Sequence, residues 1–261
     1  MFSALFHRKP PLDENSIRWM FEAYGWAFRN FPANVFFDQT QLVLADDRFF
    51  PMKVKSIQGQ AETVFARVVE YAGMAHWSWQ VADSTHYHVR GEVEIPEGAR
   101  QGFSGMRKVP MKEPLPVIYE ARWVGNLEML VAGFSHTLAQ YLVRVARELP
   151  PGGAVNWPHA IDLLTIFLGF GVPHVNSLSL FHPSRSGEVP EKKDHLSQWD
   201  AAYALAIFCV LKKIPSRDAT VALKRPLRSF FRRAMVDVQL RQDRTPELWS
   251  NEIPEPIKYR A

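Results

Sequence analysis

The sequence has only one cysteine and no long uninterrupted apolar run. The single Cys209 excludes an intramolecular disulfide and fits a reducing compartment. The most apolar long stretch, 161–181, contains Asp162, His174 and Asn176, and burying these polar groups in lipid would be energetically expensive. We therefore expect neither a disulfide scaffold nor a membrane span.

The sequence also has little excess charge of either sign, because 31 Lys and Arg residues stand against 27 Asp and Glu residues, for a formal charge of +4. This excess is far below that of a dedicated nucleic-acid-binding protein. A basic stripe over 224–233, interleaved with Phe230 and Phe231, leaves a nucleic-acid-associated surface as a second alternative function, although a solvated helix face is the simpler interpretation. In 1–9 an apolar patch precedes basic residues, the reverse of a signal peptide, so we expect a cytoplasmic protein.

The 261 residues, 47% hydrophobic and 22% charged, have the composition of a globular protein. Apolar residues spaced three and four apart predict helices. These expected helices cover 17–28, 60–72, 126–145, 160–170, 197–211 and 217–240, the last with a break near Pro226. Residues typical of β-strands predict one or two strands within 35–50 and short strands at 77–81, 87–95 and 116–119.

This order of elements predicts an α+β fold, with a small N-terminal helix and sheet region packed on a C-terminal helical bundle. We expect an N-terminal subdomain over 1–120, a helical subdomain over 121–244 and an extended tail over 245–261, together one compact domain. The helix over 17–28 has more aromatic residues than one buried stripe needs, which would fit a contact between copies of the chain.

Two predicted helices place polar residues where an active site would need them. His136 and Gln140 are four residues apart, so they share one face of the helix over 126–145. The next helix begins with Pro158 and His159 and carries Asp162 one turn later. A lone histidine on an apolar helix is most simply a hydrogen-bonded core residue.

The run 127–140 resembles the active helix of zincin metallopeptidase-like proteins, whose motif is His-Glu-x-x-His. In one zincin branch a second helix carries Glu-x-x-x-Asp, and 158–162 resembles it with the Asp retained. More broadly, 42–79 and 126–211 resemble an uncharacterised bacterial family in which a Leu-Gly-Phe-Gly segment, 168–171 here, follows that Asp. The resemblance implies a zincin-like arrangement of the two helices.

Three motif positions are changed relative to the zincins. Thr137 stands where the motif has its general base, and a hydroxyl is not basic near neutral pH. Gln140 replaces the second histidine and Pro158 replaces the glutamate ligand, which leaves His136 as the remaining zinc ligand. We therefore expect a catalytically inactive zincin-like protein with no cofactor, in which Asp162 hydrogen-bonds His136 directly.

Such a protein would act as a binding or interaction module, with a protein partner or a small ligand in the cleft between the sheet and the His136 helix. The alternative is a metal-dependent hydrolase or peptidase with a rearranged zinc site made of His136, His159 and Asp162. The two hypotheses differ in whether the purified protein holds zinc.

Other histidines give weaker signals. His86 and His88 alternate beside Asp83 and could chelate a metal, although a solvated strand face is the simpler interpretation. His174 and His182 are expected in a loop, in exposed or capping roles. None of these residues enters the predicted site.

Overall fold

The computed structural model describes residues 10–85, 95, 101, 111–181 and 195–244, and within them the fold is mostly helical. The N-terminal elements are α1 (Glu14–Asn30), the π-helical turn η1 (Val35–Gln39), α2 (Ile57–Ala72), β1 (Trp79–Asp83) and β2 (Leu115–Tyr119). The central elements are η3 (Ala121–Trp123), α3 (Leu127–Arg144), η4 (Ala154–Asn156), α4 (Trp157–Thr165), η5 (Ile166–Phe170) and α5 (Gly171–Phe181). The C-terminal elements are α6 (Gln198–Leu211), α7 (Ser216–Ala222) and α8 (Arg225–Arg244).

The predicted helices form where their capping residues stand. The side chain of Asp13 accepts hydrogen bonds from the first backbone N–H groups of α1, and Asn126 does the same for α3. α2 ends at Gly73, whose φ of 68° is the left-handed conformation of a helix C-cap. Ser197 accepts a 3.1 Å hydrogen bond from the backbone N–H of Asp200 and thereby begins α6.

The strands predicted within 35–50 do not form. Residues 35–39 are instead the π-helical turn η1, and 40–50 contain no regular strand. A strand would turn Phe36 and Phe37 to opposite faces, whereas here both rings pack against Phe28, at centroid distances of 5.0 and 5.5 Å. Aromatic packing therefore overrides the weak alternation of the sequence.

One predicted helix boundary was also wrong. Gly171 and Pro173 do not end the second buried helix, because the chain turns at Gly169 and continues as α5, with Pro173 in its first turn. The break expected near Pro226 in the helix over 217–240 is confirmed, because the chain is divided into α7 and α8 and Pro226 lies in the first turn of α8.

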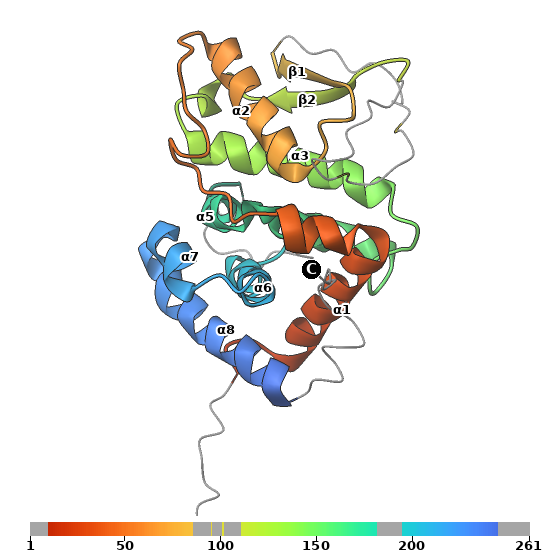
Figure 1. Ribbon diagram of the computed structural model, residues 1–261, viewed down its shortest axis with the longest axis vertical. Helices are drawn as coiled ribbons and strands as arrows, with labels where there is room; N and C mark the ends of the chain where they lie inside the picture. Colours follow the sequence, from red (N-terminus) through yellow and green to blue (C-terminus); the bar gives the residue numbers. More distant parts are fainter. Residues whose placement is uncertain (1–9, 86–94, 96–100, 102–110, 182–194, 245–261) are drawn as a thin grey trace, which may run out of the picture.

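The sheet lies at one end of the molecule, against α2 and α3 (Figure 1). β1 and β2 are parallel, with Trp79 paired to Leu115 and Asp83 to Tyr119. The strand expected at 87–95 lies almost wholly outside the described residues. Helices with a small sheet at one end are compatible with the predicted α+β class.

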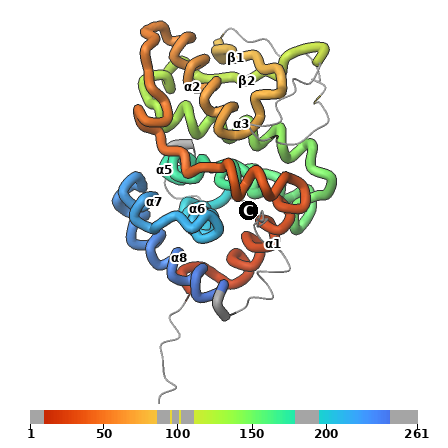
Figure 2. The backbone as a smooth tube through the Cα atoms, in the orientation of Figure 1, coloured from red at the N-terminus to blue at the C-terminus, as the bar shows by residue number. Residues whose placement is uncertain are grey.

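The remaining helices pack on the other side of α3, where α5 and α6 separate it from α8 (Figures 1 and 2). α1 closes this region from the side and contacts both α4 and α6. Because it is covered from more than one direction, α1 buries Tyr24, Trp26 and Phe28 within the chain. Their burial accounts for part of the aromatic surplus without a second copy of the protein.

One hydrophobic cluster extends from Ile17 to Val238 and includes residues on both sides of position 120. The division at 120 stays a prediction, and the predicted tail, 245–261, lies outside the described residues. The segment Ala154–Leu178 is long and apolar enough to cross a membrane, but 94% of its most apolar window is buried inside the protein. Such burial is typical of a core helix and is compatible with a soluble protein.

Candidate metal centre

Four polar side chains from four segments meet beside α3. His136 comes from α3, Asp162 from α4, His174 from α5, and His195 from the segment that precedes α6. His136 Nε2 lies 3.4 Å and His174 Nε2 lies 3.2 Å from Asp162 Oδ1. His195 Nδ1 lies 3.4 Å from Asp162 Oδ2. The carboxylate is thus surrounded by three imidazole rings.

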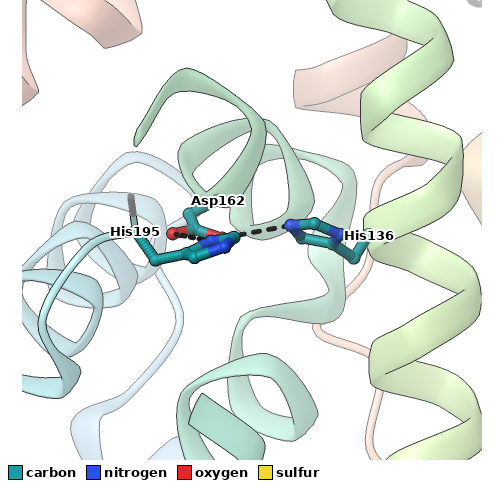
Figure 3. A group of neighbouring side chains, drawn as sticks. All are labelled: His136, Asp162 and His195. Carbon is teal, nitrogen blue, oxygen red and sulfur yellow. Dashed lines mark hydrogen bonds and ion pairs between the residues drawn. The ribbon is translucent and has the colours of Figure 1, made fainter. Parts of the chain in front are cut away.

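Figure 3 shows the rings of His136 and His195 both directed toward the carboxylate of Asp162, and the centroids of the two rings are 5.7 Å apart. One ligand atom from each of these three residues lies within 4.8 Å of the other two. Two ligand atoms of a tetrahedral zinc site, each about 2.0 to 2.1 Å from the ion, are themselves about 3.4 Å apart. His136 Nε2 and His195 Nδ1 each lie 3.4 Å from the same oxygen, Asp162 Oδ1, which matches that separation.

A sharp turn of the backbone at Gly169 brings α5 back to Asp162. Gly169 has a φ of 101°, and a Cβ atom at this position would lie 2.2 Å from the carbonyl oxygen of Gln41. The Gly169 carbonyl also accepts a 2.9 Å hydrogen bond from the backbone N–H of Val43. Only glycine fits this conformation and this close approach, and the turn places His174 beside Asp162.

Asp162 is completely buried and is held by the backbone as well as by the histidines. The N–H of Leu196 donates a 2.8 Å hydrogen bond to Oδ2. Burial by itself would raise the pKa of Asp162, but the three surrounding imidazoles hold this pKa well below its usual value. The carboxylate is therefore ionised at neutral pH, the form that binds metals.

His136 is the more accessible partner, with a side chain that is 21% exposed. Burial lowers the pKa of His136, and contact with Asp162 opposes this only in part. The ring is therefore neutral at pH 7 and its Nε2 can act as a ligand. The side-chain amide of Gln140 lies 3.4 Å from the other ring nitrogen, Nδ1.

His174 is the most buried of the three histidines, with a side chain that is 2% exposed. Its Nε2 lies 3.2 Å from Asp162 Oδ1, whereas its other ring nitrogen, Nδ1, makes no hydrogen bond within the described part of the chain. A buried polar group without a hydrogen bond costs about 1 to 3 kcal/mol. This cost is typical of a functional site, where a side chain is held for its chemistry.

A cavity of about 280 Å³ opens beside the cluster. His136, Asp162, His174 and His195 all border it. A catalytic zinc ion has three protein ligands and one open position, which needs space of this kind. The three ligand atoms and the cavity together have the arrangement of a metal centre open to a small molecule.

The structure confirms two expectations about the predicted site. His136 and Asp162 face one another from adjacent helices, and Gln140 lies on the same face as His136. The hydroxyl of Thr137 donates a 3.1 Å hydrogen bond to the carbonyl of Gly133, one turn earlier. Thr137 also borders the cavity.

Pro158 and His159 do not belong to this cluster. Both border a second cavity, of about 580 Å³, and the ring of His159 packs edge-on against Trp19 at 5.9 Å. The described residues close enough to share an ion are His136, Asp162 and His195. His195 thus takes the place that we expected for His159. His195 borders both cavities.

Sequence reasoning missed both additional histidines. His174 was expected in an exposed or capping role, but it is buried within α5 because the chain stays helical after Gly171. His195 precedes α6 in a segment without helical periodicity, so its spacing gave no signal. The other candidates, His86, His88 and His182, lie outside the described residues.

Comparisons of the chain with models of protein families, with curated proteins and with solved structures each gave no match. The zincin-like resemblance of 127–140 and 158–162 therefore rests on these residues alone. The function has to be argued from the chemistry of the site.

Proposed function

We propose that this protein is a metal-dependent hydrolase that binds zinc through His136 Nε2, the carboxylate of Asp162 and His195 Nδ1. The observation that carries the proposal is the approach of these three ligand atoms to within 4.8 Å of one another beside an open cavity. Two imidazoles and one carboxylate are a ligand set of catalytic zinc sites.

The contact distances support a metal in preference to a purely hydrogen-bonded cluster. Charge-assisted hydrogen bonds between nitrogen and oxygen are about 2.7 to 2.9 Å long. The contacts of Asp162 with the histidines are 3.2 to 3.4 Å long, whereas its bond to the Leu196 N–H is 2.8 Å. The carboxylate thus makes a short hydrogen bond to the backbone and leaves a wider space toward the rings.

A cation would also balance the charge of Asp162. An ionised and fully buried carboxylate needs a positive partner. His136 does not supply one at neutral pH, because burial lowers its pKa. A divalent cation among the three ligands would neutralise Asp162 and leave a net positive charge to attract a polarised substrate.

The surrounding residues would orient the ligands. With His136 Nε2 on the metal, Nδ1 carries the proton and donates to the amide oxygen of Gln140, which requires the amide to be turned accordingly. The Leu196 N–H and His174 hold the carboxylate of Asp162. Bound zinc would supply Lewis acidity and lower the pKa of water in the cavity.

This proposal places a rearranged ligand set on a zincin-like pair of helices, α3 and α4, in a cytoplasmic protein. The second candidate is the non-catalytic zincin-like binding module without metal. One observation favours it: Thr137 replaces the general base, and Asp162 is the only carboxylate among the described residues that border the cavity.

Metal analysis separates the two candidates. Protein purified, stripped with a chelator and dialysed against zinc should retain one equivalent, measured by mass spectrometry of the metal. His136→Ala and His195→Ala should each lose it. His159→Ala is the matched control and should keep it, because His159 packs on Trp19 and is not one of the described residues close enough to share the ion. Zinc-free wild type, or zinc lost only in His159→Ala, would contradict the proposal.

Hydrolysis is tested next with the zinc-loaded protein. Zinc-dependent cleavage of a neutral ester or peptide amide, abolished in His195→Ala and kept in His159→Ala, would support a hydrolase. Stoichiometric zinc with no cleavage across ester and peptide libraries would contradict the enzymatic part and favour a metal-containing binding module.

A further inference from the structure

We propose that the cavity beside the metal centre binds an uncharged, apolar group of the substrate, and that Gly133 sets the size of the group that fits. This inference rests on the proposed function, since it names the substrate class of that site. It is carried by the side chains that border the cavity away from the cluster.

The side chains that border the cavity outside the cluster are mostly apolar, and they include Ile118 of β2, Trp123 of η3 and Leu178 of α5. Among the described residues that border the cavity, the charged and titratable groups are those of the cluster itself. A phosphate, carboxylate or ammonium group of a ligand placed against these apolar side chains, away from the cluster, would therefore lose water without gaining a partner of opposite charge.

The volume of the cavity fits a group about the size of one amino-acid side chain. An engineered apolar cavity of about 150 Å³ binds benzene, and pockets for whole drug-sized ligands measure about 300 to 1,000 Å³. At about 280 Å³, this cavity accommodates a phenyl or branched aliphatic group, with the remainder of the ligand outside. The bond next to that group would lie beside His136 and His195.

Gly133 lies one turn before His136 on the same helix and faces Trp123. A Cβ atom at position 133 would lie 3.1 Å from Cζ3 of the Trp123 ring, closer than ordinary van der Waals contact. Glycine in a helix interior is destabilising relative to alanine, so its use here keeps space for the indole and for the cavity. A larger residue at 133 would displace Trp123 or fill the cavity.

The test measures binding of hydroxamates to zinc-loaded protein by calorimetry. The hydroxamate group binds zinc, so the tail alone varies: acetyl, 4-methylpentanoyl, 3-phenylpropanoyl and the negatively charged succinyl. We expect the two apolar tails to bind at least tenfold more tightly than acetyl, and the succinyl tail to gain nothing over acetyl. Equal or tighter binding of the succinyl compound would overturn the inference.

Two variants locate the effect. Gly133→Val should abolish the preference for apolar tails while zinc content stays at one equivalent, and Gly133→Ala, the milder change, should reduce it. Gly125→Val is the matched control, because a Cβ at Gly125 would meet no atom within 4 Å. An unchanged preference in a folded, zinc-containing Gly133→Ala or Gly133→Val protein would overturn the role of Gly133.

A zinc-free probe keeps this inference distinct from the proposed function. If the protein binds no zinc, 3-phenylpropanamide is used instead, with binding followed by ligand-observed NMR. Binding that is lost in Gly133→Val and kept in Gly125→Val would support the cavity inference although the hydrolase proposal had failed. Absence of binding to wild type would overturn both.

Discussion

His195 Nδ1 lies 3.4 Å from Asp162 Oδ2, and the N–H of the next residue, Leu196, donates a 2.8 Å hydrogen bond to the same oxygen. Two consecutive residues thus contact one carboxylate. Leu196 does so through its backbone and His195 through its side chain, whose Nδ1 also lies 3.4 Å from the other oxygen, Oδ1. The backbone bond fixes the start of α6 against α4. It thereby places the imidazole of His195 beside that carboxylate, with its ring centroid 5.7 Å from that of His136.

His174 should increase the zinc affinity of the centre without being required for zinc binding. His174→Ala removes an imidazole that lies 3.2 Å from Asp162 Oδ1, so the carboxylate loses one of its supports. Loss of such an outer partner lowers metal affinity about 10- to 100-fold. We expect one equivalent of zinc at saturation and a correspondingly weaker Kd in a competition assay with a chromophoric chelator. Affinity equal to wild type would show that His174 has no positioning role.

The sequence predicted the pairing of His136 with Asp162 because both residues lie on helices with clear periodicity. Asp162 entered through the resemblance of 158–162 to a zincin helix. Helix limits followed capping residues, as at Asp13 and Gly73, since a cap satisfies backbone groups locally. These features depend on neighbours in the sequence and could therefore be predicted.

The remainder of the cluster depends on contacts between distant segments. The turn at Gly169 fits against the backbone of Gln41, which a local pattern does not encode. η1 forms because the rings of Phe36 and Phe37 both pack against Phe28 of α1, which is a contact between separate elements. For the same reason the positions of His174 and His195 could not be derived from spacing.

The metal-free protein should lose stability as the pH falls below neutrality. The pKa of His136 is lowered by burial, so below about pH 6.5 the unfolded chain takes up a proton that the folded chain does not. The contribution of Asp162, whose folded pKa is also lowered, is lost at still lower pH, below its usual range near 3.8. Both groups therefore lower the free energy of unfolding as the pH falls.

Urea unfolding of the metal-free protein between pH 7.5 and 5 measures this effect. The free energy of unfolding should fall with pH, and His136→Gln should flatten the decline because its side chain does not titrate. His159→Gln serves as the control and should keep the wild-type slope. A decline as steep in His136→Gln as in wild type would show that other groups cause it.

Tyr203 connects α6 to an ionic network between α8 and α1. Its hydroxyl donates a 2.6 Å hydrogen bond to Asp237, which also accepts from Arg241, and Arg241 pairs with Glu14. A hydrogen bond to a charged group contributes about 1.5 to 3 kcal/mol. We expect Tyr203→Phe to lower the free energy of unfolding by that amount, measured in urea.

Tyr71→Phe is the matched comparison for that variant. The hydroxyl of Tyr71 donates a 3.1 Å hydrogen bond to the carbonyl oxygen of Phe49, a neutral acceptor. This substitution should cost less, about 0.5 to 1.5 kcal/mol. An effect of Tyr203→Phe no larger than that of Tyr71→Phe would mean that the Asp237 network adds no stability.

The turn at Gly169 should be the most sensitive backbone position near the centre. Gly169→Ala combines a positive φ of 101° with a Cβ only 2.2 Å from the Gln41 oxygen. A strained φ alone costs about 1 to 3 kcal/mol, and the clash adds to it. We expect the free energy of unfolding to fall by more than about 3 kcal/mol, and zinc affinity to fall with it, because the turn positions His174.

Gly153→Ala separates the two causes. Gly153 also has a positive φ, 81°, but a Cβ there would meet no atom within 4 Å. The free energy of unfolding of Gly153→Ala should therefore fall only by the cost of the strained φ, about 1 to 3 kcal/mol. The variant should keep wild-type zinc affinity, because Gly153 lies in the loop before α4. Equal losses of stability in the two variants would mean that the segment at Gln41 moves aside. Zinc affinity in Gly169→Ala would then report directly whether the position of α5 matters to the centre.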